Sequence, residues 1–363
     1  MATRTVPTRA PRRSVLVGAF VAVVVVAVIG VIAARSQSPT VPASGIPAPI
    51  QVPTEPATLT PHTEGDVTTW TMPDALVGLR DVEVGADGRV WLTEQNTAQI
   101  ASLDGDRLST YQLNASFPDA GAFAFAPASD GSLWFTGYPG GTLGRVLPDG
   151  RANLFGSRGE AATTLGIVQG PDGAMWTTDP NLGEVVRIGE DGSVRPTLIS
   201  EDGGQTRRPG FIAPGSDGAL WFTIPDTDEI GRITTGDAPD VTRYRVPGGG
   251  VPRDIVAAPD GTLWASLEDR TALVRIDPAQ AQVEVVPLRG RMPTPGLDDL
   301  ALAPDGTIWV TTPSSTVLHV GTDGRVLGRV TIPGASYADG VTVAPDGAVW
   351  VAARDDVLAK IQP

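Results

Sequence analysis

The side chains most able to do chemistry in this sequence are carboxylates and arginines that keep a fixed distance from a recurring Asp-Gly pair. Some lie seven or six residues before the aspartate of the pair, and others lie seven residues after it. Carboxylates that converge on one opening can hold a hard cation such as Mg²⁺ or Ca²⁺, and arginines can pair with them or with an anionic group of a ligand. These candidate ligand-binding residues are Arg80, Asp81, Glu94, Asp179, Arg253, Asp254, Asp298, Asp299 and Asp339.

Two of these carboxylates, Asp298 and Asp339, are also the candidate catalytic groups. Proton abstraction from carbon near neutral pH requires a base with a pKa near 7. An aspartate reaches that range only if burial or a like-charged neighbour raises its pKa, as Asp299 beside Asp298 would do. The candidate metal ligands are Glu94, Asp298 and Asp339. The alternative is a solvated rim of ordinary ion pairs, which requires no ligand.

Other kinds of chemistry are excluded by composition. The chain of 363 residues has no cysteine and only two histidines, His62 and His319, so thiol chemistry and disulfides are ruled out. No HExxH motif, Ser-His-Asp arrangement or phosphate-binding loop is present. The net charge of −14 argues against a nucleic-acid partner. The expected partner of the candidate residues is therefore a small molecule, a peptide or a protein.

The candidate residues are positioned by a repeat that fills the chain from about residue 65 onward. Asp-Gly suits the tight turn of a β-hairpin, in which glycine takes a positive φ, and apolar segments flank each turn. Successive turn aspartates lie 41 to 45 residues apart, and a tryptophan stands four residues after each one. The turn aspartates are Asp87, Asp130, Asp172, Asp217, Asp260, Asp305 and Asp346.

Seven such units predict an all-β, seven-bladed β-propeller over residues 65–363. Each unit has four strands, for example 300–303, 307–312, 317–320 and 326–332. Strands that are apolar on both faces need cover on both, which neighbouring blades provide, and the repeated tryptophan is expected to pack between blades. The last unit lacks a fourth strand, so we expect residues 66–71 to complete it and close the ring. The positions seven before and seven after each turn aspartate should then be cross-strand neighbours at the channel mouth.

The first 64 residues have a different composition. Residues 1–13 carry four arginines and no acid, and 14–35 include an uncharged run of twenty residues that is long enough to cross a bilayer. Arginines before such a run predict a cytoplasmic N-terminus and an exported remainder. We expect a single-pass signal anchor in the cell membrane and a monomeric extracytoplasmic propeller, or a secreted protein if the anchor is cleaved. Residues 36–64 are rich in Pro, Ser and Thr and predict an extended, disordered linker.

Two units carry a resemblance to a known family. Gly215 to Ile233 (GSDGALWFTIPDTDEIGRI) and Ser129 to Val146 (SDGSLWFTGYPGGTLGRV) are similar to the repeats of the streptogramin B lyases, also called virginiamycin B lyases. The resemblance covers about residues 65–363 and implies a seven-bladed propeller. It also implies a Mg²⁺-dependent elimination that opens a cyclic depsipeptide antibiotic.

The resemblance does not extend to the family's catalytic residues. The family's pattern places a histidine seven residues before the turn aspartate in two repeats near the C-terminus, where this chain has Asp298 and Asp339. Its two metal-binding glutamates correspond to Tyr337 and Ala353 here. The sequence therefore favours a binding module at the membrane. The alternative is a divalent-metal-assisted carbon–oxygen lyase that acts on a cyclic peptide or depsipeptide.

His319 does not supply the missing histidine. It occupies a third-strand position that is Arg145, Arg187, Arg232 or Arg275 in other repeats. We expect it at a blade edge, away from the mouth.

Overall fold

The computed structural model describes residues 48–49, 56–74, 76–97, 99–113, 121–138, 141–149, 151–157, 162–189, 192–199, 207–290 and 295–363. They belong to the second of two compact units, Val41–Pro363. The predicted cytoplasmic segment 1–13 and transmembrane segment 14–35 lie outside the described residues. Within the described ranges, no helix is long and apolar enough to cross a membrane.

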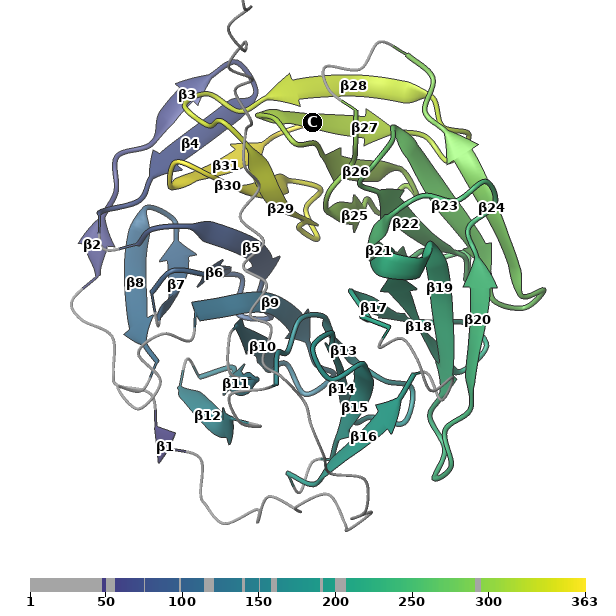
Figure 1. The fold of residues 1–363 in the computed structure, drawn as a ribbon. Helices are drawn as coiled ribbons and strands as arrows, with labels where there is room; N and C mark the ends of the chain where they lie inside the picture. Colours follow the sequence, from purple (N-terminus) through teal and green to yellow (C-terminus); the bar gives the residue numbers. More distant parts are fainter. Residues whose placement is uncertain are drawn as a thin grey trace, which may run out of the picture. The chain divides into compact units, whose positions relative to one another are not determined.

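The described part of the chain forms seven antiparallel sheets around a central axis (Figure 1). The innermost strands contact one another in chain order and the last contacts the first, so the predicted seven-bladed propeller is confirmed. From inside to outside, blade 1 is β5 (Leu79–Val84), β6 (Val90–Glu94), β7 (Gln99–Asp104) and β8 (Arg107–Gln112); blade 2 is β9 (Gly121–Pro127), β10 (Leu133–Tyr138), β11 (Thr142–Val146) and β12 (Ala152–Ser157); blade 3 is β13 (Ile167–Gln169), β14 (Met175–Asp179), β15 (Glu184–Ile188) and β16 (Val194–Leu198).

The remaining blades repeat this order. Blade 4 is β17 (Ile212–Pro214), β18 (Ala219–Ile224), β19 (Glu229–Thr234) and β20 (Val241–Arg245), with the short 3-10 helix η1 (Pro225–Thr227) between β18 and β19; blade 5 is β21 (Pro252–Ala257), β22 (Leu263–Leu267), β23 (Ala272–Asp277) and β24 (Gln282–Pro287); blade 6 is β25 (Leu300–Leu302), β26 (Ile308–Thr311), β27 (Thr316–Val320) and β28 (Val326–Thr331); blade 7 is β29 (Ala338–Val343), β30 (Val349–Ala353), β31 (Val357–Ile361) and β4 (Val67–Thr71).

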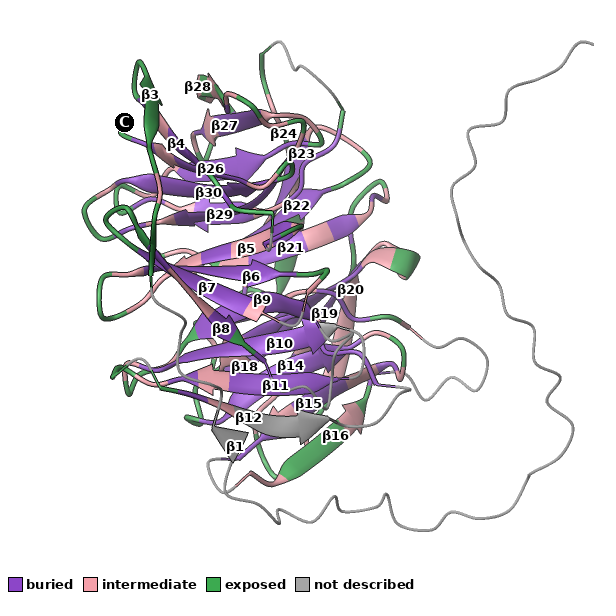
Figure 2. Cartoon of the chain, turned by 90° about the vertical axis from the view of Figure 1, so that its left-hand side faces the viewer, coloured by how far each residue is buried: buried purple, intermediate pink, exposed green. Residues whose placement is uncertain are grey.

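The Asp-Gly-x-x-Trp repeat builds the hairpin between the first two strands of each blade and the contact with the next blade. Gly306 takes a φ of 85° at its turn, a conformation that glycine adopts without strain. Trp221 in blade 4 is fully buried and packs in one cluster with Ile255 and Leu263 of blade 5. The predicted inter-blade role of the tryptophan is confirmed. Figure 2 shows the resulting pattern, in which the second strands are buried and outermost strands such as β16 are exposed.

His319 lies where the sequence predicts. In blade 4 the turn aspartate Asp217 accepts hydrogen bonds from Trp221 Nε1 at 3.2 Å and Arg232 Nε at 2.6 Å. In blade 6 His319 takes the place of the arginine. It stacks on Trp309 with ring centroids 4.5 Å apart and hydrogen-bonds through Nε2 to the Thr307 hydroxyl at 2.7 Å. His319 therefore has a packing role at a blade edge.

At six of the seven junctions between neighbouring blades, one hydroxyl joins the two blades. In blade 6, the Thr311 hydroxyl accepts the N–H of Asp299 at 2.9 Å and donates to the carbonyl of Asp339 in blade 7 at 2.9 Å. Ala352 occupies this position in blade 7, so the junction from blade 7 to blade 1 has no such hydroxyl. The other five hydroxyls, which make the same two bonds, belong to Thr93, Thr136, Thr178, Thr223 and Ser266.

The ring closes within blade 7. Strand β4 pairs antiparallel with β31, with Trp70 opposite Leu358, which confirms the predicted closure. Trp70 stacks on Trp350 at 5.4 Å, and its Nε1 donates to Asp106 Oδ1 of blade 1 at 2.9 Å. The same aromatic residue thus holds both the last blade and its junction with the first.

Within the predicted linker over 36–64, three short strands pair with outer strands of the blades. β3 (His62–Glu64) extends blade 7 by pairing with β4, β2 (Ala57–Thr58) extends blade 1 by pairing with β8, and β1 (Ala48–Pro49) extends blade 2 by pairing with β12. We call these three strands the strap. They are short because the prolines of this segment lack the N–H groups that a longer ladder requires. Linker residues 36–47 and 50–55 lie outside the described residues.

Candidate functional site

β-bulges set the geometry of the channel mouth. In blade 1 the register of β5 against β6 shifts between Leu79 and Val82, and Glu94 pairs with Leu79. The expected cross-strand pairing of Arg80 with Glu94 is therefore wrong by one residue. A bulge places two residues opposite one, and it re-aims the side chains at that point. Consequently the consecutive residues Arg80 and Asp81 both line the central cavity.

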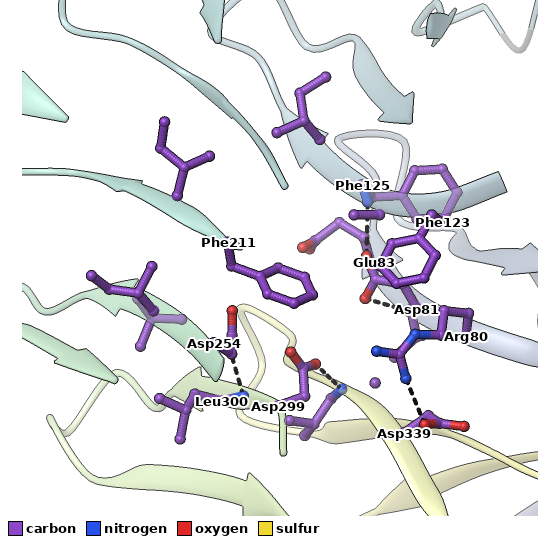
Figure 3. Close-up of a pocket in the computed structure, with 18 residues that line it drawn as sticks. Arg80, Asp81, Glu83, Phe123, Phe125, Phe211, Asp254, Asp299, Leu300 and Asp339 are labelled. Atoms are coloured by element: carbon purple, nitrogen blue, oxygen red, sulfur yellow. Dashed lines mark hydrogen bonds and ion pairs between the residues drawn. The ribbon is translucent and has the colours of Figure 1, made fainter. Parts of the chain in front are cut away.

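One ion-pair network joins blades 7 and 1 at the mouth, and Asp339 of blade 7 is at its centre. Arg80 Nη1 of blade 1 donates to Asp339 Oδ1 at 2.5 Å (Figure 3), and Arg354 Nε donates to Asp339 Oδ2 at 2.9 Å. The Arg80 guanidinium also lies 4.9 Å from the ring centroid of Phe123 in blade 2, and that of Arg354 lies 4.0 Å from the ring centroid of Tyr337. Both oxygens of the buried Asp339 carboxylate thus accept from arginine.

A second network holds Asp298. Arg253 Nε of blade 5 donates to Asp298 Oδ1, and the Tyr337 hydroxyl of blade 7 donates to Asp298 Oδ2 at 2.7 Å. Burial raises the pKa of Tyr337 well above its ordinary value, and the hydrogen bond to Asp298 adds to the increase, so Tyr337 remains a donor. Asp298, like Asp339, has both oxygens occupied.

Below this rim, three aspartates tie neighbouring blades together along the channel. Each of them accepts the backbone N–H of a residue on or next to the innermost strand of the following blade. A carboxylate that accepts such a bond fixes the relative position of two blades, and so has a structural role in addition to lining the cavity. The bonds are Phe125 N–H to Asp81 at 2.7 Å, Leu300 N–H to Asp254 at 2.9 Å, and Val341 N–H to Asp299 at 2.8 Å.

These aspartates and Glu83 surround a cavity of about 160 Å³ (Figure 3). Burial raises the pKa of Asp81 to about 6 and that of Glu83 to about 7. Burial also raises the pKa of Asp299 well above its ordinary value, and the charges of Asp254 and Asp81 add to the increase. Burial likewise raises the pKa of Asp254 above its ordinary value. The throat of the channel is a set of partly protonated carboxyl groups.

Glu94 and Asp179 lie apart from this cavity. Glu94 accepts the Val77 N–H and the Thr97 hydroxyl, and burial raises its pKa to about 7. Asp179 accepts the backbone N–H groups of three residues, at 3.1 to 3.2 Å. The donors to Asp179 are Thr163, Asn181 and Leu182. Both acids therefore fix loop backbone at the mouth end of their own blades.

The residues present do not fit the Mg²⁺ site that the resemblance implies. Within the described ranges, no three His, Cys, Asp or Glu side chains are grouped so that they could hold a metal ion. Asp298 and Asp339 accept from arginines, whereas Glu94 accepts from a loop N–H and a hydroxyl.

Sequence reasoning missed several residues of the site. Glu83 lines the cavity two residues after Asp81, and the two-residue period of a strand was the signal that would have found it. Phe211 faces Phe123 across the cavity with ring centroids 6.3 Å apart. No sequence pattern pointed to Arg354, because its pairing with Asp339 depends on the local fold of blade 7.

Comparison with known proteins gives a consistent result. The sequence model described as the virginiamycin B lyase family matches residues 65–361. A virginiamycin B lyase from Nocardia farcinica (strain IFM 10152) is 28% identical over 213 residues, which is 58% of this chain and only 56% of that relative.

Solved structures show the same fold. A crystal structure of virginiamycin B lyase from Staphylococcus aureus is similar with a TM-score of 0.73 and 24% identity, and covers 82% of this chain and 99% of that one. A catalytically inactive variant from the same organism, solved with quinupristin, gives a TM-score of 0.71, 24% identity and the same two coverages.

Proposed function

The chain belongs to the virginiamycin B lyase family, and from that premise we propose that it is a binding member that holds a ligand at its channel mouth without breaking it. The ligand is a small molecule, a peptide or a protein segment. The observation that carries the proposal is the state of Asp298 and Asp339, whose four carboxylate oxygens all accept hydrogen bonds from arginine or tyrosine.

A general base must present a free lone pair to the proton that it removes, with a pKa near the working pH. On Asp339, an incoming proton would compete with two guanidinium groups, those of Arg80 and Arg354, for the carboxylate oxygens. On Asp298, it would compete with Arg253 and Tyr337. Charge-assisted hydrogen bonds of this kind are stronger than neutral ones, so displacing an arginine from either carboxylate costs free energy. The mouth is therefore built to recognise and not to abstract a proton.

The connections around the mouth support a binding role. The connections that lead from one blade to the next differ in length, from the short 332–337 to the long 199–211. The hairpin turns at the opposite end of the channel stay close to one length, as at 85–89, 170–174 and 303–307. Varied loops on a constant scaffold are where binding proteins place their specificity. The strand ends that these connections join lie at the end of the channel that carries the arginine–carboxylate networks.

We also propose that the propeller is held at the cell membrane on its extracytoplasmic side. The uncharged run within 14–35 and the arginines before it support an uncleaved signal anchor. Fractionation of cells that express the full chain, with protease added from outside, would test this. The proposal fails if the propeller is protected in intact cells.

The binding proposal is tested with quinupristin as the probe. The full chain is incubated with it, with and without Mg²⁺, and the products are followed by mass spectrometry beside the Staphylococcus aureus lyase as a positive control. We expect the depsipeptide to stay cyclic with this chain. Linear product that disappears on changing Asp339→Asn would overturn the proposal and establish the lyase alternative.

A further inference from the structure

The junction between blades 7 and 1 is built differently from the other six. It lacks the hydroxyl that bridges every other pair of blades, because Ala352 stands where Thr or Ser stands elsewhere. Closure of the ring also depends on pairing of β4 with β31, the two ends of the propeller chain. We call this part of the ring the seam; other contacts take the place of the bridging hydroxyl here, among them the Arg80–Asp339 ion pair and the Trp70–Asp106 hydrogen bond.

The strap lies over the seam. β3 extends blade 7 and β2 extends blade 1, so the strap crosses from one side of the junction to the other (Figure 1). Between these strands, the Leu59 N–H donates to the Asp106 carbonyl of blade 1 at 2.8 Å. Leu59 is partly buried and packs against the cluster that contains Trp70 and Trp350 of blade 7. Asp106 thus binds the strap through its backbone and blade 7 through its side chain.

The strap lies outside the residues that the family model matches. The family match begins at residue 65, directly after β3. The strap therefore supplies contacts at the seam that are not part of the family's repeat.

We infer that the strap is a clamp that holds the seam closed from the outside. With the strap docked, Leu59 and Asp106 keep β4 against blade 1. The same junction carries the Arg80–Asp339 ion pair at the mouth, because Arg80 belongs to blade 1 and Asp339 to blade 7. Release of the strap loosens this junction before any other, and with it the geometry of the mouth.

Hydrogen–deuterium exchange of the full chain tests the clamp. Changing Leu59→Ser removes the apolar contact, and we expect amides of β4, β31 and β5 to exchange on the order of tenfold faster, while those of β14 and β18 keep their rates. The matched control, Leu198→Ser, changes a leucine on the strap-free outer strand β16 that is 58% exposed, and leaves all rates unchanged. Unchanged seam rates in Leu59→Ser, or equal acceleration in all blades, would overturn the inference.

A disulfide gives the opposite perturbation and does not depend on the stability of the serine variant. Thr58 and Arg107 are exposed cross-strand partners in a chain that has no cysteine. The adjacent Leu59–Asp106 hydrogen bond makes them a non-hydrogen-bonded pair, with Cα atoms about 4.5 Å apart, within the range of a disulfide. T58C/R107C should cross-link on mild oxidation and slow exchange at the seam, and reduction should reverse the effect.

The control for this experiment is T58C/R151C, in which the second cysteine lies on blade 2 and no cross-link is expected. The inference is wrong if T58C/R107C does not cross-link within one chain. It is equally wrong if the cross-link forms and exchange at β4, β31 and β5 stays the same. Neither readout involves a ligand, so the result is independent of the proposed binding function.

Discussion

Replacing Glu83 by glutamine tests the electrostatics of the channel. Glu83 accepts the Val84 N–H at 2.9 Å and the Thr342 hydroxyl at 3.3 Å, and a glutamine carbonyl can accept both. Burial, followed by the charge of Asp81, raises the pKa of Glu83 from 4.5 to about 7. At about 1.4 kcal/mol for each pKa unit, this difference corresponds to about 3 kcal/mol of folding free energy.

The direction in which pH changes the free energy of unfolding depends on which state, folded or unfolded, holds the Glu83 proton. Between these two pKa values the folded protein keeps the Glu83 proton and the unfolded chain releases it, so the stabilisation is complete below about pH 4.5 and is lost as the pH rises through 7. The glutamine of Glu83→Gln has no titratable proton, so the variant does not lose this stability as the pH rises. We expect the variant to match the wild type near pH 4.5 and to exceed it by about 3 kcal/mol near pH 8.

Urea denaturation followed by tryptophan fluorescence measures this at both pH values. The control is Glu284→Gln, which makes the same chemical change at an exposed glutamate on β24 and should leave the pH dependence of the wild type intact. If Glu83→Gln loses as much stability as the wild type between the two pH values, Glu83 is not held protonated in the folded state. The account of the throat as partly protonated would then be refuted.

Three further outcomes are expected. Trp221→Ala should lower the free energy of unfolding by about 3–5 kcal/mol, because it empties a fully buried site between blades 4 and 5; a loss below about 1 kcal/mol in urea would contradict the inter-blade role. Ala352→Ser should raise the melting temperature by supplying the seventh inter-blade hydroxyl, with a gain of about 1 kcal/mol, and a lower melting temperature would show that the site has no room for it. Millimolar Mg²⁺ or Ca²⁺ should leave the melting temperature unchanged, because the mouth carboxylates are paired; an increase by mass action would reveal a cation site.

The local features of the repeat made most of the fold predictable. An Asp-Gly turn with apolar flanks specifies a hairpin whatever surrounds it, and a tryptophan at a constant offset specifies which face meets the next blade. With seven copies identified, the remaining question was how the ring closes. The segment around Trp70 resembles the outer strands of other repeats, which predicted that it completes the last blade. His319 could be placed for the same reason, since its position in the repeat was known from its equivalents.

The site was predictable only as a set of positions. The sequence indicated that Arg80, Arg253, Asp298 and Asp339 approach one opening, but not which of them pair. Arg80 and Asp339 are 259 residues apart, and no local pattern relates them. The register error at Glu94 has a similar cause, because a bulge arises from competition between strand twist and pairing and leaves no clear mark in the sequence.

By itself, the sequence determined the seven blades, their closure and the residue types at the mouth, because each of these follows from a period repeated along the chain. The tertiary structure alone decided three things: that arginines neutralise Asp298 and Asp339, that Glu83 joins Asp81 in a buried throat, and that strands β1 to β3 lie along the outer edges of three blades. The physical reason is the same in each case. Ion pairing, desolvation and edge pairing depend on distances between groups from different blades, and only the closed ring sets those distances.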